Sequence, residues 1–136
     1  MKWLVKEEPT HFPFSQFVKD GGTVWSGVRN PLAQKHLRSM KKGDRVFYYH
    51  TGNEKAIIGT ATVASAPTPD PKDTSGKLFV VDLVPDKPLP RPVTLAEIKA
   101  AKRFADFPLV RLPRLSVMPV TDEQWAAIEA MAKSGG

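Results

Sequence analysis

Apolar and polar residues alternate, or recur at helical spacing, along most of the chain, and this pattern predicts short elements. Strands are expected at 2–6, 23–25, 44–50, 56–66, 77–86 and 114–120. Helices are expected at 15–22, 31–42, 94–100 and 121–132. Glycines and prolines bound most of these segments, which is typical of turns between short elements.

The expected helices carry recognisable end signals. Asn30 is a good N-cap, Pro31 is a favoured first helical residue, and Gly43 is expected to end that helix. Capping boxes are predicted for the two later helices, from Thr94 with Glu97 and from Thr121 with Gln124. Ser/Thr followed three residues later by Glu/Gln is a helix-start signal, so helices are expected to begin after Thr94 and Thr121.

The order of elements predicts an α+β fold. No crossover helix separates the strands at 44–50, 56–66 and 77–86, so we expect them to form an antiparallel meander in a curled sheet. The result is a small, mainly antiparallel β-barrel decorated by short helices. We expect a single domain over residues 1–133 and a frayed tail at 134–136.

Composition narrows the classes of partner. The 136 residues carry a net charge of +6, which fits either simple solubility or a phosphate-bearing partner such as nucleic acid. There is no apolar run of about 18 residues and no signal-peptide core in the opening "MKWLVKEEP". We therefore expect a soluble, cytoplasmic protein without a membrane partner.

The sequence lacks the motifs of most catalytic and metal-binding sites. The chain has no cysteine, no P-loop and no dinucleotide-binding glycine fingerprint. His11, His36 and His50 lack metal-ligand spacing, and no nucleophile-elbow motif supports a catalytic triad. We expect no cofactor, no metal and no catalytic residues.

The stretch "TVWSGVRN" is the strongest candidate for a binding site. Trp25 stands beside the small Ser26 and Gly27, which leaves space for a flat group to stack on the indole. The helix that starts at Asn30 should offer backbone N–H groups to a phosphate, and Arg29 can contact a phosphate or a base edge. In the structural alternative, Trp25 fills the barrel and Arg29 pairs with a carboxylate such as Asp44.

Other segments offer further candidates. Lys6 and Glu8 would share one face of the first strand, either as a surface ion pair or as a donor and acceptor on a pocket rim. In "VFYYHTGN", Phe47 and Tyr49 should face one side while Tyr48 and His50 face the other, one pair being core. Ser116 could meet a base edge or be an ordinary strand serine. A cationic run on the expected helix could follow phosphates or be a solvated face; its members are Lys35, Arg38, Lys41 and Lys42.

Taken together, these segments resemble the EVE domain, a family of the PUA-like superfamily. The resemblance rests on "WLVKEEP", "VWSGVRN", "LRSMKKGDRVFYYHTG", "IIGTATV", "VTLAEIK" and "RLSVMPVTDEQW", in this order. It implies a PUA-like pseudo-barrel whose pocket accepts a flipped base. EVE domains are linked to modified cytosine in DNA, such as 5-methylcytosine, and the related YTH domains read N6-methyladenosine in RNA.

The resemblance thus implies a non-catalytic reader whose partner is DNA with modified cytosine, or modified RNA. The implied base-binding residues are Lys6, Glu8, Trp25, Ser26, Gly27, Val28, Arg29, Asn30, Tyr48, Tyr49, His50, Thr51, Arg114 and Ser116. The chain departs from the family at Pro31 and Thr51, where an aromatic residue and a serine are common. Its 67–76 loop is also shorter than in many members, and Leu78 stands where they have a Trp.

Two rival functions remain open at this point. The related ASCH domains include small amidohydrolases that use Lys, Thr and Glu, for which Lys6, Thr51 and Glu8 are possible counterparts on a modified nucleoside. A protein-binding module with a vestigial pocket is the other alternative, and it would lack affinity for nucleic acid at low salt.

Overall fold

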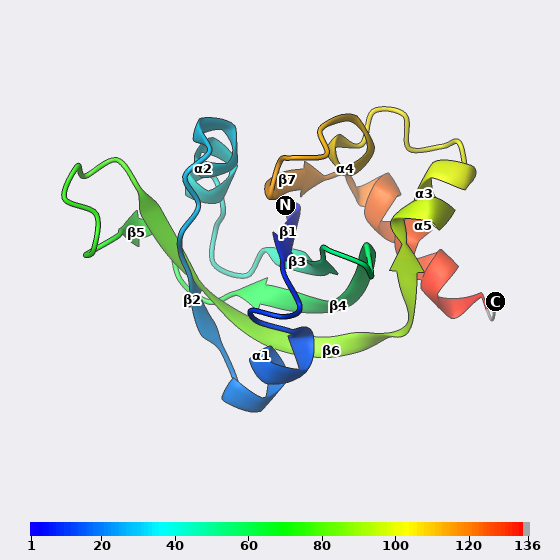
Figure 1. Ribbon diagram of the computed structural model, residues 1–136, viewed down its shortest axis with the longest axis horizontal. Helices are drawn as coiled ribbons and strands as arrows, with labels where there is room; N and C mark the ends of the chain where they lie inside the picture. Colours follow the sequence, from blue (N-terminus) through cyan, green and yellow to red (C-terminus); the bar gives the residue numbers. More distant parts are fainter. Residues whose placement is uncertain (135–136) are drawn as a thin grey trace.

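The computed structural model describes residues 1–134 and has a mixed α+β fold (Figure 1). The strands are β1 (Lys2–Glu7), β2 (Thr23–Trp25), β3 (Arg45–His50), β4 (Ala56–Val63), β5 (Thr68–Pro69), β6 (Phe79–Thr94) and β7 (Val117–Val120). The helices are α1 (Phe14–Asp20), α2 (Pro31–Arg38), α3 (Leu95–Ala100), α4 (Pro108–Arg111) and α5 (Asp122–Lys133). None of the helices in this part of the chain has the length and apolar character needed to cross a membrane.

The sheet is curled into a half-barrel with the strand order β2-β6-β4-β3-β1-β7, and β5 pairs with β6. The meander β3-β4-β6 is antiparallel, as predicted, whereas β1 and β3 run parallel. Figure 1 shows β6 sweeping across the molecule from the β5 hairpin to α3, with α3, α4 and α5 gathered at one side. The predicted fold class is confirmed, with the sheet closing only part of a barrel.

Local end signals explain the confirmed helices. Thr94 and Glu97 form a capping box on α3, and Thr121 and Gln124 form one on α5. Gly21 ends α1 in the left-handed conformation, with φ of +77°. These signals act within one turn of helix, so the sequence alone reveals them.

Several boundaries differ from the predicted ones. Strand β6 extends to Thr94 and not to residue 86, because its second half pairs with the start of β4. Strand β7 begins at Val117, and α4 was not predicted because it is a single turn. The tail expected at 134–136 lies outside the described residues except for Ser134, whose carbonyl accepts a hydrogen bond from Arg91 Nε at 3.0 Å.

Aromatic side chains fill both faces of β3. Phe47 stacks on Trp125, with ring centroids 3.7 Å apart, while Tyr48 packs against aromatic rings of the opposite face. Trp3 is buried, and its Nε1 donates to Asp44 at 2.9 Å. Phe47 and Tyr48 therefore face opposite sides of β3, as predicted. All four residues from Phe47 to His50 are buried, however, so the expectation that one pair alone is core is wrong.

Candidate functional site

One buried side chain pins the segment from Trp25 to Asn30, which links β2 to α2. The Gln34 amide is 4% exposed, and its Nε2 donates to Val28 O at 2.7 Å and to Phe79 O at 3.1 Å. Its Oε1 accepts from Phe79 N at 3.0 Å. Gly27 has φ of +75°, which a residue with a Cβ rarely adopts. The segment therefore has a fixed shape between α2 and β6.

Asn30 caps α2, as its sequence position predicts. Its Oδ1 accepts from Leu32 N at 2.9 Å and from Ala33 N at 3.0 Å, and Gln34 N donates to Asn30 O at 2.9 Å. Pro31 has no N–H to offer. Because the N–H groups of the first turn are already bonded, the prediction that this helix end receives a phosphate through free N–H groups is wrong.

Tyr48 is the centre of an aromatic cluster that holds Trp25. Its ring lies 5.5 Å from Trp25 at 83°, 5.3 Å from Phe14 at 65° and 5.2 Å from Phe17 at 22°. Its hydroxyl donates to Phe12 O, and burial raises the pKa of the phenol well above its usual range. Tyr48 is fully buried, so it positions Trp25 and does not line an open pocket.

Trp25 lines a hollow of about 220 Å³, although only 6% of the residue is exposed. Both interpretations of Trp25 therefore hold in part, because the indole is mostly core and still reaches an open cavity. The other lining residues come from β2 and the residue after it, and from the end of β1 with the turn that follows it: Glu7, His11, Phe12, Thr23, Val24 and Ser26.

Sequence reasoning identified Trp25 and Ser26 but missed the other wall of this hollow. His11 Nδ1 lies 3.3 Å from Glu7 Oε1, so a carboxylate and an imidazole stand together at the wall. The only available signal was the aromatic and polar turn "PTHFPF" that follows the first strand. Its approach to β2 depends on tertiary packing.

His50 has a structural role that the sequence did not suggest. The residue is 5% exposed, and its Nε2 accepts a hydrogen bond from Phe14 N at 3.0 Å. Nδ1 must then carry the proton, and it donates to Glu54 Oε2 at 3.1 Å. Both ring nitrogens are thus used within the protein, so the expectation that His50 offers polar contacts to a ligand is wrong.

Lys6 and Glu8, near the end of β1, each bond to a different partner. Lys6 Nζ donates to Pro113 O at 2.9 Å and lies 5.6 Å from the centre of the Tyr49 ring. Burial lowers the pKa of Lys6. Glu8 follows the end of β1, and its Oε1 accepts from Thr51 Oγ1 at 2.7 Å. The proposed ion pair between Lys6 and Glu8 does not form among the described residues.

The "RLSV" segment lies beside a second hollow. Ser116 is half-buried, and its carbonyl accepts from Lys6 N at 3.0 Å. Arg114 is exposed and lines a hollow of about 320 Å³. Its other lining residues are Asn30, Leu32, Arg111, Leu112, Pro113 and Leu115. The structure thus brings the predicted residues Asn30 and Arg114 together, at a hollow adjoining the Trp25–Asn30 segment.

The cationic run is not one helical face. Lys35 and Arg38 lie in the later half of α2, which ends at Arg38, and Lys41 and Lys42 follow in a turn. The prediction that all four lie on the helix next to its N-terminus is therefore wrong. The alternative pairing of Arg29 with Asp44 is also wrong. The carboxylate of Asp44 instead accepts from Trp3 Nε1, from Lys41 N and from the terminal amine.

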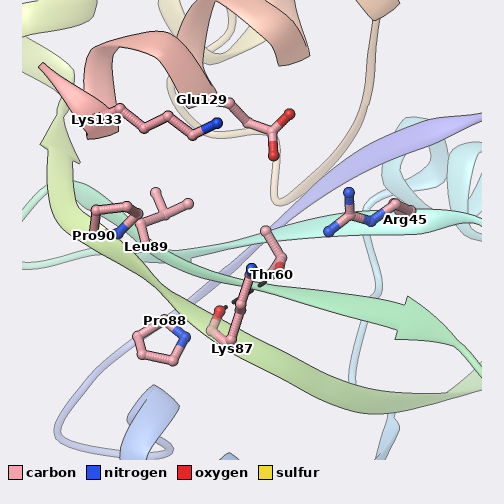
Figure 2. Close-up of a pocket in the computed structure, with 8 residues that line it drawn as sticks. All are labelled: Arg45, Thr60, Lys87, Pro88, Leu89, Pro90, Glu129 and Lys133. Carbon is pink, nitrogen blue, oxygen red and sulfur yellow. Dashed lines mark hydrogen bonds between the residues drawn. The ribbon is translucent and has the colours of Figure 1, made fainter.

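A further hollow of about 240 Å³ lies at the other end of β3, between the sheet and α5 (Figure 2). Its lining residues are Arg45, Thr60, Lys87, Pro88, Leu89, Pro90, Glu129 and Lys133. The lining includes no aromatic ring, so it offers no surface on which a base could stack. The hollow at Trp25 is the better candidate for a flat ligand.

Comparison with known proteins agrees with the resemblance found in the sequence. The family model "EVE domain" matches residues 1–131. The NMR structure of a Rhodopseudomonas palustris protein shares 47% identity at a TM-score of 0.92, covering 96% of this chain and 92% of that one. An ASCH-named protein from Zymomonas mobilis has 13% identity and a TM-score of 0.57, which is a likeness of fold alone.

Human thymocyte nuclear protein 1 is similar in both sequence and structure. The sequences are 30% identical over 126 residues, an alignment that spans 76% of this chain but 56% of the human protein. The crystal structure of the human protein in complex with 5-methylcytosine-containing DNA superposes with a TM-score of 0.90 at 25% identity. That comparison covers 99% of both chains.

Proposed function

The chain belongs to the EVE domain family, and from this membership we propose that it is a non-catalytic nucleic-acid-binding module. In this proposal one base leaves the duplex and enters the hollow beside Trp25, with modified cytosine as the preferred base. As part of the same proposal, residues 1–133 act as a single domain in the cytoplasm.

The observation that carries the proposal is the pairing of an open hollow with an immobilised indole. Trp25 lines a space of about 220 Å³, and Tyr48 holds it edge to face at 5.5 Å. Pockets for drug-sized ligands measure about 300–1,000 Å³, so this space suits a single ring better than a whole nucleotide. The likeness to human thymocyte nuclear protein 1 bound to 5-methylcytosine DNA supports the same assignment.

The cost of flipping a base and the gain from binding it in the hollow are similar in size. Flipping a base costs a few kcal/mol, and stacking on an aromatic side chain returns about 1–3 kcal/mol. A carboxylate is the side chain that accepts from the cytosine N4 amine, and Glu7 supplies one in the hollow. Since only 6% of Trp25 is exposed, its stacking contribution lies at the low end of this range, and the hydrogen bond to Glu7 supplies the rest of the offset.

The methyl group of 5-methylcytosine would add apolar contact. Phe12 and Val24 both line the hollow and give it apolar wall. Burial of one methyl group is worth about 0.8 kcal/mol. Because 1.4 kcal/mol is a factor of ten in affinity, we expect methylated DNA to bind about fourfold more tightly than unmethylated DNA.

An enzyme of the ASCH type is the weaker hypothesis for this geometry. The bond between Glu8 and Thr51 joins two of its three counterparts, but Lys6 Nζ donates to Pro113 O instead. Incubation of the protein with acylated and alkylated nucleosides would reveal any turnover. A protein-only module would differ from both by having no affinity for nucleic acid at low salt.

The test of the proposal is equilibrium binding to matched duplexes that differ in a single cytosine, which is plain, methylated or hydroxymethylated. We expect the duplexes with modified cytosine to bind more tightly than the duplex with plain cytosine. Trp25→Ala should abolish this difference. A matched RNA hairpin carrying N6-methyladenosine tests the RNA variant of the proposal. Equal affinity for all three duplexes, unchanged by Trp25→Ala, would contradict the proposed reading of modified cytosine.

A further inference from the structure

Two exposed leucines lie at the second hollow. Leu32 in the first turn of α2 is 40% exposed, and Leu112, directly after α4, is 42% exposed. Both line the hollow of about 320 Å³, whose wall also includes Pro113 and the buried Leu115. They come from segments about eighty residues apart in sequence, so the fold assembles this apolar patch from separate parts of the chain.

Three exposed arginines lie in the same segments. Arg111 and Arg114 line the hollow with the leucines, and Arg29 comes directly before Asn30, which also lines it. Across residues 1–134, none of these arginines takes part in an ion pair. The surface therefore has an apolar centre with unpaired cations around it. This arrangement complements a stack of bases flanked by phosphates.

The patch adjoins the hollow that holds Trp25. Ser26 lines the Trp25 hollow and Asn30 lines the other, so the two lie four residue steps apart along one segment. An extended chain spans at most about 3.6 Å per residue, which places these two points within about 14 Å. Duplex DNA rises 3.4 Å per base pair, so the distance corresponds to about four base steps or fewer. The two hollows are thus close enough along the chain for one duplex to reach both.

We propose that Leu32 and Leu112 form an apolar wedge that contacts the base stack at the gap left by the flipped base. Arg29, Arg111 and Arg114 hold the phosphates on either side. The inference rests on the proposed function and adds the residues that open the duplex. Extrusion of a base leaves its neighbours unstacked, and apolar side chains such as Leu are the groups that proteins insert at opened base steps.

A second copy of this chain fits the patch less well than a duplex does. Two copies meeting here would bring six arginines together without a carboxylate among the lining residues. A stable protein interface also buries about 1,200–2,000 Å², far more than two leucines provide. Charge complementarity therefore favours a polyanion over a protein copy.

The test compares double- and single-stranded ligands with the double variant Leu32→Ala/Leu112→Ala. The control is Val84→Ala, an apolar residue that is 38% exposed and lies outside both hollows. We expect the double variant to bind a duplex with one 5-methylcytosine at least fivefold more weakly than wild type. It should bind the same single strand within twofold, because a single strand needs no opening. The variant should stay folded, with a small fall in melting temperature, since each leucine is partly exposed and partly packed.

The outcomes separate the wedge from the base hollow. An equal loss on duplex and single strand, or no loss on either, would overturn the wedge while leaving the Trp25 site intact. If Trp25→Ala changes neither ligand's affinity, the proposed function fails, and the wedge fails with it. A patch that instead mediates self-association would give a dimer of wild type that the leucine variant dissociates.

Discussion

The Trp25 and Tyr48 rings meet edge to face, with centroids 5.5 Å apart and planes at 83°. Trp25 ends one edge strand of the sheet, whereas Tyr48 lies near the middle of the sheet on β3. The contact therefore connects the outer edge to the rigid core. An indole held in this way loses little freedom when a ligand stacks on it, which favours binding.

Loss of the Gln34 amide should loosen the binding segment. Gln34→Ala removes three hydrogen bonds, to Val28 O, Phe79 O and Phe79 N. At about 0.5–1.5 kcal/mol each, we expect the free energy of unfolding to fall by roughly 2–4 kcal/mol. Urea titration measures this fall. DNA affinity should also fall under conditions where the variant is fully folded.

Gln16→Ala is the matched control for that variant. Gln16 is an exposed amide on α1 that bonds only Asp20 in the described structure. Its removal should change neither stability nor binding appreciably. Stability loss in Gln34→Ala without any loss of binding would separate the segment from ligand recognition.

The salt dependence of DNA binding should reveal the role of Arg29. This arginine is exposed, and a single phosphate contact contributes about 0.9 to the slope of log affinity against log salt concentration. We expect Arg29→Ala to reduce that slope by about 0.9 while weakening binding to all sequences alike. Arg103→Ala, outside both the Trp25 hollow and the leucine patch, should leave the slope unchanged. The same slope in wild type and Arg29→Ala would remove Arg29 from the interface.

Stability in acid should depend on Glu97. The hydrogen bond from Arg91, together with those from Thr94, lowers the pKa of Glu97 to about 2 from an ordinary value of 4.5. A carboxylate whose pKa falls on folding stabilises the protein above its unfolded pKa, and this contribution is lost as the pH falls towards 2. We expect wild type to melt above Glu97→Gln at pH 7, with the gap closing between about pH 4.5 and 2. A gap that is constant with pH would mean that the charge of Glu97 does not contribute.

Local features of the fold were predictable from sequence, and contacts between distant segments were not. Asn30 with Pro31, and the capping boxes at Thr94 and Thr121, act within a turn of helix and were predicted correctly. Residue Gly59 illustrates the opposite case. A Cβ there would lie 2.4 Å from the Phe14 ring, so a residue with a side chain would clash with Phe14. Phe14 lies forty-five residues earlier in the sequence, so the local pattern does not reveal this contact.

The candidate site also has a part that was predictable from sequence and a part that was not. Trp25 and Ser26 were found because an aromatic residue beside small ones is visible in the sequence, and Glu7 and His11 were missed because they reach the hollow only through tertiary packing. His50 was misassigned for a related reason, since its partners Phe14 N and Glu54 are set by the fold. The sequence pattern identifies side chains suited to a site but not the partners that already use them.

Base flipping into the Trp25 hollow can be measured with 2-aminopurine placed next to a single 5-methylcytosine in a duplex, because its fluorescence rises when its neighbour leaves the stack. We compare wild type with Ser26→Phe, which fills the hollow from an exposed position and leaves the core unchanged. Wild type should raise the fluorescence on binding, and Ser26→Phe should not, even at protein concentrations that saturate the duplex. The same rise with both proteins, or no rise with wild type on a saturated duplex, would contradict capture of a flipped base at Trp25.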